Sequence, residues 1–273
     1  MTGTTGGIGL EIARGLARRG AEVILHGRNL ARVEAVADSI REQVKGAQLE
    51  SVAADLSSLA EVRAMAATIA ARHPRLDVLV NNAGVLMTRL ELSAEGYEMT
   101  FAVNHLAPFL LTNLLLDNLR RSGGGRVVTL SSVAHKSGVI DFDNLKGERG
   151  FNAWAAYTSS KLANILFTTE LANRVEGTGV TANCLHPGAI NTGLWRRSRA
   201  MALAFAVLQP FFPSPADGAD TAIYLAGEPA VADINGGYFS KRRMRRPANQ
   251  AFDAGVQRRL WDLSAEITGV GKD

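Results

Sequence analysis

The sequence lacks features that several classes of protein require. Its only cysteine, Cys184, excludes an internal disulfide and lies in the apolar run 180–185, so we expect a small buried side chain and a reducing, cytoplasmic setting. Neither CxxC nor HExxH occurs, and the histidines are never at metal-ligand spacing, which predicts no metal site. The longest apolar stretch, residues 200–212, is shorter than the roughly 20 residues that span a bilayer. No integral membrane segment is therefore expected.

Charge of neither sign dominates the chain. Thirty Lys and Arg residues stand against 26 Asp and Glu, and the net charge of +4 does not distinguish a phosphorylated ligand from an ordinary soluble surface. Five cations fall between Lys241 and Arg246, without interleaved aromatic residues or a recognition motif. We interpret this run as a solvated loop rather than a site for anionic lipid or nucleic acid, and predict no nucleic-acid partner.

Short apolar runs alternate with amphipathic stretches along the chain. Apolar residues recur at intervals of three and four in 32–44 and 62–69, as in helices that cover a sheet. Near-continuous apolar strands separated by such helices predict an α/β fold with a doubly wound parallel sheet of the Rossmann type. No repeat or linker divides it, so a single domain over residues 1–273 is expected. The predicted strands are 22–25, 49–53, 78–80, 126–130 and 180–185.

A glycine-rich loop opens the sequence and leads into an apolar helix face. Glycine lets the backbone turn sharply and approach a diphosphate, whose charge is stabilised by the free amides of a helix N-terminus. The residues of this loop that we expect to contact a dinucleotide are Gly3, Thr5, Gly7, Ile8 and Gly9.

A strand normally leads into such a loop, but only Met1 precedes Thr2. We therefore expect the first strand to be missing, with strands 22–25 and 78–80 facing each other across a gap of unpaired backbone groups. On this interpretation the chain is an incomplete version of a longer protein, with poor solubility and weak cofactor binding.

The end of the predicted strand 22–25 indicates which dinucleotide is bound, and the ends of the next two strands offer further contacts. An acidic residue after the second strand of such a fold bonds a ribose 2′-hydroxyl, whereas an arginine suits a 2′-phosphate. This sequence has Gly27 and Arg28 there, which favours NADP(H), with NAD(H) as the alternative. Further contacts are expected from residues at the ends of the next strands, namely Asp55, Leu56, Asn82, Ala83 and Gly84.

Polar residues that suit carbonyl reduction follow the later strands. Tyr157 and Lys161, at i and i+4, share one face of a predicted helix, and Ser132 follows the strand 126–130. Hydride transfer to a carbonyl creates an alkoxide that must be hydrogen-bonded and protonated as it forms. We expect Lys161 to favour the Tyr157 phenolate, Ser132 to hold the substrate oxygen, and Asn104 to order a proton path from Lys161 towards solvent.

Together these motifs resemble the short-chain dehydrogenases, in particular the retinol-dehydrogenase-like branch that includes the catalytic part of the WW-domain oxidoreductases. The resemblance covers the chain from Thr2 to Gly269. It rests on Thr2-Gly3-x-x-x-Gly7-Ile8-Gly9, Asn81-Asn82-Ala83-Gly84, Val103-Asn104-His105-Leu106, Val133-Ala134-His135, Tyr157-x-x-x-Lys161 and Leu185-His186-Pro187-Gly188. Tyr157 follows Ser132 by 25 residues, roughly twice the spacing in most short-chain dehydrogenases. The retinol-dehydrogenase-like branch has this insertion between the two residues, and whether the insertion contacts substrate stays open.

The resemblance implies an oxidoreductase that acts on CH–OH groups with NAD(P). It implies a catalytic tetrad of Asn104, Ser132, Tyr157 and Lys161, with Lys161 also bonding the nicotinamide ribose. It further implies a cofactor loop that contains Pro187, Gly188, Ile190 and Thr192.

The region after this loop points to a lipophilic carbonyl or alcohol substrate. The segment of about 193–215 is rich in apolar and aromatic residues where this fold covers its substrate, although packing on the core or on a second subunit explains it equally well. A non-catalytic NADP(H) sensor is an alternative, but such a protein would be expected to lose Tyr157 or Lys161. An extended-type sugar-nucleotide epimerase or dehydratase is disfavoured by the glycine spacing and the short C-terminal part. The oligomeric state, including a homo-oligomer, stays open.

Overall fold

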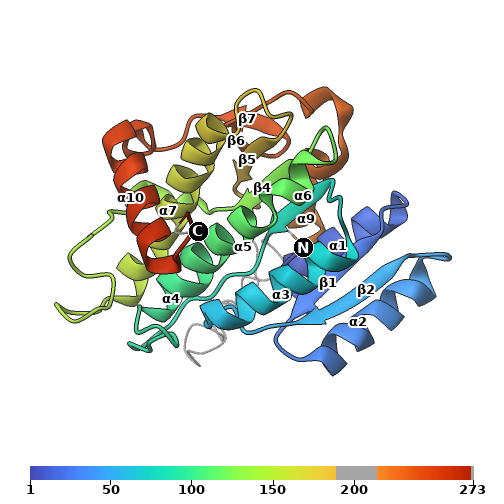
Figure 1. The fold of residues 1–273 in the computed structure, drawn as a ribbon, viewed down its shortest axis with the longest axis horizontal. Helices are drawn as coiled ribbons and strands as arrows, with labels where there is room; N and C mark the ends of the chain where they lie inside the picture. The colour runs from blue at the N-terminus through green and yellow to red at the C-terminus, as the bar shows by residue number, and fades with distance from the viewer. Residues whose placement is uncertain (189–213, 272–273) are drawn as a thin grey trace.

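The computed structural model describes residues 1–188 and 214–271, in which helices cover both faces of a layer of mainly parallel strands (Figure 1). The strands are β1 Val23–Gly27, β2 Leu49–Ala53, β3 Val78–Asn81, β4 Arg126–Leu130, β5 Thr181–Leu185, β6 Tyr238–Ser240 and β7 Arg243–Arg245. The five strands predicted from the sequence are confirmed to within two residues at each end. The pair β6 and β7 was missed.

Several of the helices begin at residues whose side chains cap them. The longer ones are α1 Gly7–Arg18, α2 Leu30–Gln43, α3 Leu59–Arg72, α5 Ala107–Leu114, α7 Ala153–Arg174, α9 Pro215–Gly227 and α10 Ala254–Thr268. Short ones are α4 Met99–Phe101, α6 Leu116–Arg120, the π-helix η1 Ala102–Leu106, and the 3-10 helices η2 Val133–Ser137, η4 Pro229–Val231 and η5 Asn249–Phe252. Asn29, Ser58 and Asn152 accept backbone N–H bonds at the starts of α2, α3 and α7. None of the described helices is long and apolar enough to cross a membrane.

The described strands form two sheets, in which all neighbouring strands except β6 and β7 pair in parallel. β1 pairs with β2, and the second sheet runs β3-β4-β5-β6-β7, in which only β7 is antiparallel. The order places the carboxyl ends of β1, β3, β4 and β5 at one edge of the molecule. In doubly wound folds that edge is where ligands bind.

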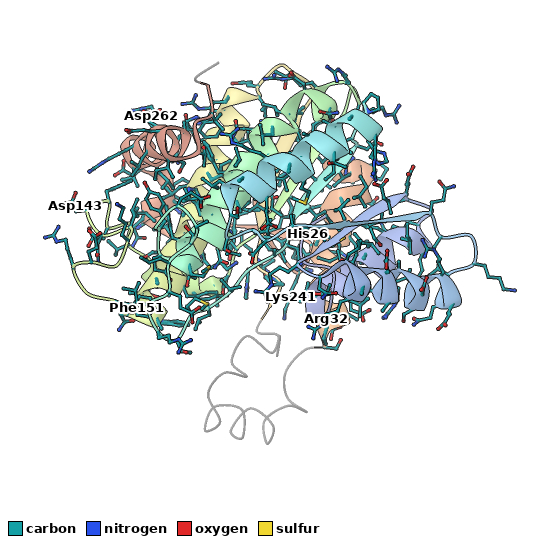
Figure 2. All side chains as sticks on the ribbon, turned by 60° about the horizontal axis from the view of Figure 1, so that its bottom comes forward. His26, Arg32, Asp143, Phe151, Lys241 and Asp262 are labelled. Atoms are coloured by element: carbon teal, nitrogen blue, oxygen red, sulfur yellow. The ribbon has the colours of Figure 1, made fainter. Side chains whose placement is uncertain are left out.

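The basic run 241–246 is not the loop that we predicted. Lys241 and Arg242 form a tight turn with φ of 52° and 56°, and Arg243–Arg245 pair antiparallel with β6. Lys241 lies at this turn (Figure 2). The side chains of the run are exposed, as we expected, but the backbone extends the sheet.

Residues 1–4 lie between the two sheets and bond to both. The Met1 amino group donates to Ile24 O at 2.9 Å, Thr2 N to Val80 O at 3.0 Å, and Thr4 N to His26 O at 2.8 Å. The gap of unpaired groups that we predicted between β1 and β3 is therefore partly filled by this segment, because it is extended enough to reach both neighbours.

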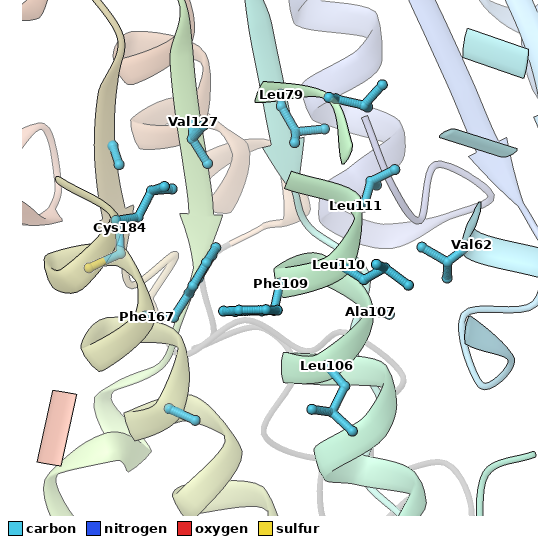
Figure 3. Close-up of a cluster of buried hydrophobic side chains, with 14 of the residues drawn as sticks. Val62, Leu79, Leu106, Ala107, Phe109, Leu110, Leu111, Val127, Phe167 and Cys184 are labelled. Carbon is cyan, nitrogen blue, oxygen red and sulfur yellow. The ribbon is translucent and has the colours of Figure 1, made fainter. Parts of the chain in front are cut away.

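The core divides by strand face. Leu79, Val127 and Cys184 point to the side covered by α3, α5, α7 and α10, where Phe109 and Phe167 pack with their ring centres 5.6 Å apart (Figure 3). Their strand neighbours point to the opposite side, against α1 and α9. Cys184 is 1% exposed, which confirms that it is a buried apolar side chain.

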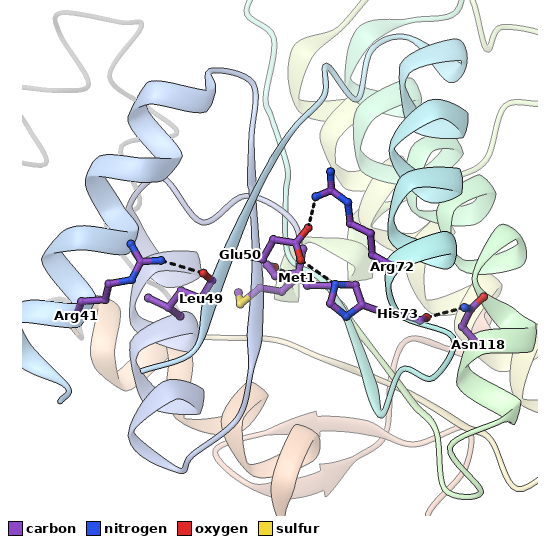
Figure 4. A network of polar contacts seen from close by, with 8 residues as sticks. Met1, Arg41, Leu49, Glu50, Arg72, His73 and Asn118 are labelled. Carbon is purple, nitrogen blue, oxygen red and sulfur yellow. Dashed lines mark hydrogen bonds and ion pairs between the residues drawn. The ribbon is translucent and has the colours of Figure 1, made fainter. Parts of the chain in front are cut away.

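The outer strand β2 is fastened to α3 by an ionic cluster. Glu50 accepts hydrogen bonds from Arg72 and His73, each at 2.8 Å, and Asn118 donates to His73 O (Figure 4). These contacts fix the end of α3 that lies farthest from the carboxyl edge of the sheet.

Candidate active site

A cavity of about 1100 Å³ follows the carboxyl ends of the strands. It is lined by nearly every residue that the sequence singled out, namely Gly3, Thr5, Gly7, Ile8, Gly9, Arg28, Asp55, Leu56, Asn82, Ala83, Gly84, Ser132, Tyr157, Lys161, Pro187 and Gly188. Of the remaining predicted residues, Asn104 lies directly behind the cavity wall, and Ile190 and Thr192 lie outside the described residues. The predicted substrate-covering segment also lies outside them, apart from residues 214 and 215.

The glycine loop has the geometry of an anion cradle. Gly3 and Gly7 have φ of 71° and 57°, which favour glycine. A Cβ on Gly9 would lie 2.0 Å from the Gly3 carbonyl oxygen, so the start of α1 can approach the loop only as glycine. Asn82 donates to the carbonyls of Thr2 and Gly3 at 2.9 and 3.0 Å and fastens the loop to the end of β3. The first residues of α1 line the cavity.

The end of β1 carries a buried histidine whose role the sequence did not reveal. His26 is 3% exposed; its Nδ1 accepts from Gly3 N at 3.2 Å, and its Nε2 lies 3.1 Å from Ala54 O, to which it must donate. Burial lowers the pKa of His26 to about 4, so the ring stays neutral and keeps both bonds. A histidine within an apolar strand was the only signal in the sequence.

Polar groups for the adenosine half of a dinucleotide lie just beyond His26. Arg28 is exposed at the cavity edge, and Asp55 accepts from the Ser57 amide and hydroxyl at 2.9 and 2.8 Å. A Cβ on Gly27 would lie 2.5 Å from Thr5 Cγ2, so only glycine lets the end of β1 pack this closely against the glycine loop. Together with the glycine loop, these groups give one end of the cavity a polar lining that suits a dinucleotide.

Tyr157, Lys161 and Ser132 meet at the other end of the cavity. The Ser132 side chain lies within reach of the Tyr157 hydroxyl and lowers its pKa. Lys161 Nζ lies 5.6 Å from the centre of the Tyr157 ring and 3.4 Å from Leu130 O, and the Lys161 side chain is almost wholly buried. α7 supplies the tyrosine and lysine from adjacent turns, and β4 delivers the serine.

Burial sets the pKa values of this group. It raises the pKa of the Tyr157 hydroxyl, and the hydrogen bond with Ser132 opposes that rise without reversing it. It also lowers the pKa of Lys161 to about 8. We expected Lys161 to favour the Tyr157 phenolate; in this structure the pKa of Tyr157 is raised, with burial of the phenol as the largest cause. The arrangement therefore holds a neutral phenol, which is a proton donor.

Asn104 lies in the π-helix η1 and joins the cavity wall to α7. Its Oδ1 accepts from Val85 N at 2.7 Å, and its Nδ2 donates to Val85 O at 2.9 Å and to Ser160 Oγ at 3.0 Å. A Cβ on Gly84 would lie 3.3 Å from both Asn104 Oδ1 and Lys161 Nζ. The two side chains thus approach the same point of the backbone from different helices.

The space beside Tyr157 is apolar. Trp154 lies at the end of the insertion, lines the cavity and has its ring centre 6.0 Å from that of Tyr157. The rest of the insertion runs along the outside, as Asp143 and Phe151 show (Figure 2). Apolar residues from other elements complete this end, namely Val85, Leu86, Met87, Met99, Val103 and Val133.

The chain is similar to known dehydrogenases over its whole length. The family model of short chain dehydrogenases matches residues 1–203. Retinol dehydrogenase 13 of Homo sapiens is 43% identical, with 99% of this chain and 84% of that protein covered. Retinol dehydrogenase 14 of Mus musculus is 43% identical, with 100% and 86% covered.

Solved structures have the same fold. A protein of Mycobacterium paratuberculosis gives a TM-score of 0.78 at 33% identity, with 98% of this chain and 91% of that chain covered. A short chain dehydrogenase of Shigella flexneri, complexed with NADP, gives a TM-score of 0.71 at 30% identity, with 89% and 95% covered.

Proposed function

We propose that this chain, which belongs to the retinol-dehydrogenase-like branch of the short-chain dehydrogenase family, interconverts lipophilic carbonyl compounds and alcohols with NADP(H). It is an oxidoreductase that acts on CH–OH groups. The observation that carries the proposal is that Ser132, Tyr157 and the buried Lys161 meet in the cavity that also contains the glycine loop. When bound, the nicotinamide supplies or accepts the hydride.

In this proposal the residues at the apolar end handle the oxygen and its proton. Ser132 donates a hydrogen bond to the carbonyl oxygen, and Tyr157 Oη transfers its proton to that oxygen as negative charge develops there. The raised pKa of Tyr157 keeps it protonated at neutral pH. Lys161 holds a positive charge near the phenolate that remains, and Asn104 orders a proton path behind it.

A dinucleotide fits the opposite end of the cavity. The amides of Gly7, Ile8 and Gly9 at the start of α1 suit a diphosphate, because they are free N–H groups at the positive end of a helix dipole. Arg28 is the partner for a 2′-phosphate, and no acidic residue stands between it and Leu25. The NADP complex of the Shigella relative supports the same preference. NAD(H) stays the alternative.

A lipophilic substrate is favoured by the apolar lining around Trp154 and by the similarity to retinol dehydrogenases. Carbonyl compounds with an apolar body would replace water there and gain about 25 cal/mol per Å² of buried apolar surface. A cytoplasmic setting stays a prediction, and the oligomeric state stays open.

An activity panel tests the proposal. The protein is mixed with NADPH and aldehydes or ketones, and with NADP⁺ and the matching alcohols, while nicotinamide absorbance is followed. We expect turnover of long-chain or polyprenoid compounds, with lower kcat/KM for short hydrophilic ones. Absence of turnover with every compound and both cofactors, in a protein that melts cooperatively, would contradict the proposal.

A further inference from the structure

The turn that carries Ser132 is held by a buried histidine that the proposed reaction does not use. His135 is fully buried in η2, and its Nδ1 lies 2.6 Å from the carbonyl oxygen of Ser132. The backbone N–H of His135 donates to the same oxygen at 3.1 Å. The Ser132 carbonyl is thus fixed by both the ring and the main chain of His135.

The opposite ring nitrogen determines the tautomer. His135 Nε2 lies 3.1 Å from the backbone N of Ala248, which can only donate, so Nε2 must be an unprotonated acceptor. A neutral ring then carries its hydrogen on Nδ1, where it is donated to Ser132 O. Burial lowers the pKa of His135, which agrees with a neutral ring.

These bonds connect the C-terminal part of the chain to the reacting group. Ala248 immediately precedes η5, more than a hundred residues after Ser132. On the other side of the turn, Val133 N donates to His186 Nδ1 at 3.2 Å, and His186 lines the cavity beside Pro187. The Ser132 hydroxyl itself caps η2, where it accepts from Ala134 N at 3.2 Å. Movement of the Ser132 carbonyl would therefore displace the hydroxyl from Tyr157.

We propose that His135 is a positioning residue whose Nδ1–H bond to the Ser132 carbonyl sets the Ser132 hydroxyl against Tyr157, with Ala248 fixing the ring. The proposal deepens the function above and rests on it for its effect on turnover. A role in packing alone would depend instead on the ring shape, because His135 also packs edge-on against Tyr238 with ring centres 5.1 Å apart.

Two amide variants, each replacing one ring nitrogen, separate these roles. In His135→Asn the side-chain amide NH₂ takes the place of Nδ1–H, and in His135→Gln the amide oxygen takes the place of Nε2 but the donor to Ser132 is lost. We expect His135→Asn to keep kcat near that of the native protein. We expect His135→Gln to lower kcat by about 10- to 100-fold, as for a small misplacement of a reacting group, with KM for NADPH unchanged. Equal losses in both variants, or full activity of His135→Gln, would overturn the proposal.

A second readout does not need turnover. Carbon NMR of labelled tyrosine, with Tyr157 assigned through Tyr157→Phe, follows the titration of the Tyr157 hydroxyl, whose pKa the Ser132 bond lowers. We expect the pKa of Tyr157 to rise in His135→Gln, towards its value in Ser132→Ala, and to stay unchanged in His135→Asn.

This readout separates the two proposals. A native protein that reduces no carbonyl but shows this pattern contradicts the proposed function and supports the role of His135. Identical Tyr157 titrations in the two variants contradict that role. Should His135→Gln fail to fold, loss of kcat in a folded His135→Asn with normal NADPH affinity would by itself overturn the proposal.

Discussion

Lys161 Nζ lies 5.6 Å from the centre of the Tyr157 ring, one helical turn along α7, and both side chains are largely withdrawn from water. Their proximity puts a cation beside a phenol in a site where charge is poorly screened. Burial works against both charged forms, since it raises the pKa of Tyr157 and lowers that of Lys161 to about 8. The phenol therefore stays protonated and can donate a proton, while the buried charge of Lys161 lowers the stability of the folded protein.

Replacing Lys161 with Met should stabilise the protein while abolishing turnover. The unfolded lysine has a pKa near 10.5, so its lowering to about 8 means that the buried charge costs about 3 kcal/mol at pH 7. Methionine has a similar shape and no charge. Urea unfolding at pH 7 should give a higher free energy of unfolding for the variant.

The pH dependence of that difference has a definite sign. Between pH 8 and 10.5 the unfolded lysine binds a proton that the folded one does not, so the stability of the native protein rises with pH in this window. The advantage of Lys161→Met should therefore shrink as pH rises from 8 to 10.5. A difference that stays constant with pH would show that Lys161 is not a buried cation.

Replacing Gly9 with Ala should disrupt the anion cradle. The added Cβ would lie 2.0 Å from Gly3 O and 2.5 Å from Asn82 Nδ2, so the loop or α1 must shift. We expect NADPH affinity, measured by fluorescence titration, to fall at least about tenfold, equivalent to about 1.4 kcal/mol. The control Gly124→Ala adds the same methyl where no heavy atom lies within 4 Å. Equal affinities in the two variants would contradict the close approach.

Arg28→Asp should change the cofactor preference. Aspartate repels a 2′-phosphate and can accept a hydrogen bond from a 2′-hydroxyl, so the ratio of affinities should turn from NADPH towards NADH. Arg32→Asp makes the same charge change on α2, outside the cavity lining. Both variants are titrated with both cofactors. If Arg28→Asp keeps the native ratio, Arg28 is only a surface charge.

The parallel strands and the cavity could be predicted from the sequence because their signals are local. Runs such as 126–130 are mainly apolar because both faces of the strand are covered, and the residues that follow each run lie at the carboxyl edge of the sheet. Ser132 and Asn82, each two residues beyond a predicted strand, could therefore be expected at this edge, and both line the cavity.

What was missed depends on contacts between distant residues. The turn between β6 and β7 has positive φ at Lys241 and Arg242. Because neither Gly nor Asn, the usual signals of such a turn, occurs there, the basic run did not predict a hairpin. The role of His26 appears only when Gly3 and Ala54 are brought to its two ring nitrogens. The pKa of Tyr157 likewise depends on how deeply α7 packs, which no spacing in the sequence reveals.

The most direct test of Tyr157 as the proton donor compares the turnover of Tyr157→Phe with that of the control Tyr97→Phe. Phenylalanine keeps the ring but removes the hydroxyl that bonds Ser132, whereas Tyr97 lies outside the cavity lining. With the best substrate of the panel and saturating NADPH, we predict that Tyr157→Phe lowers kcat by about 10² to 10⁴-fold with nearly unchanged NADPH affinity, and that Tyr97→Phe keeps native kcat. Native kcat in a folded Tyr157→Phe protein would contradict the assignment of Tyr157 as the proton donor.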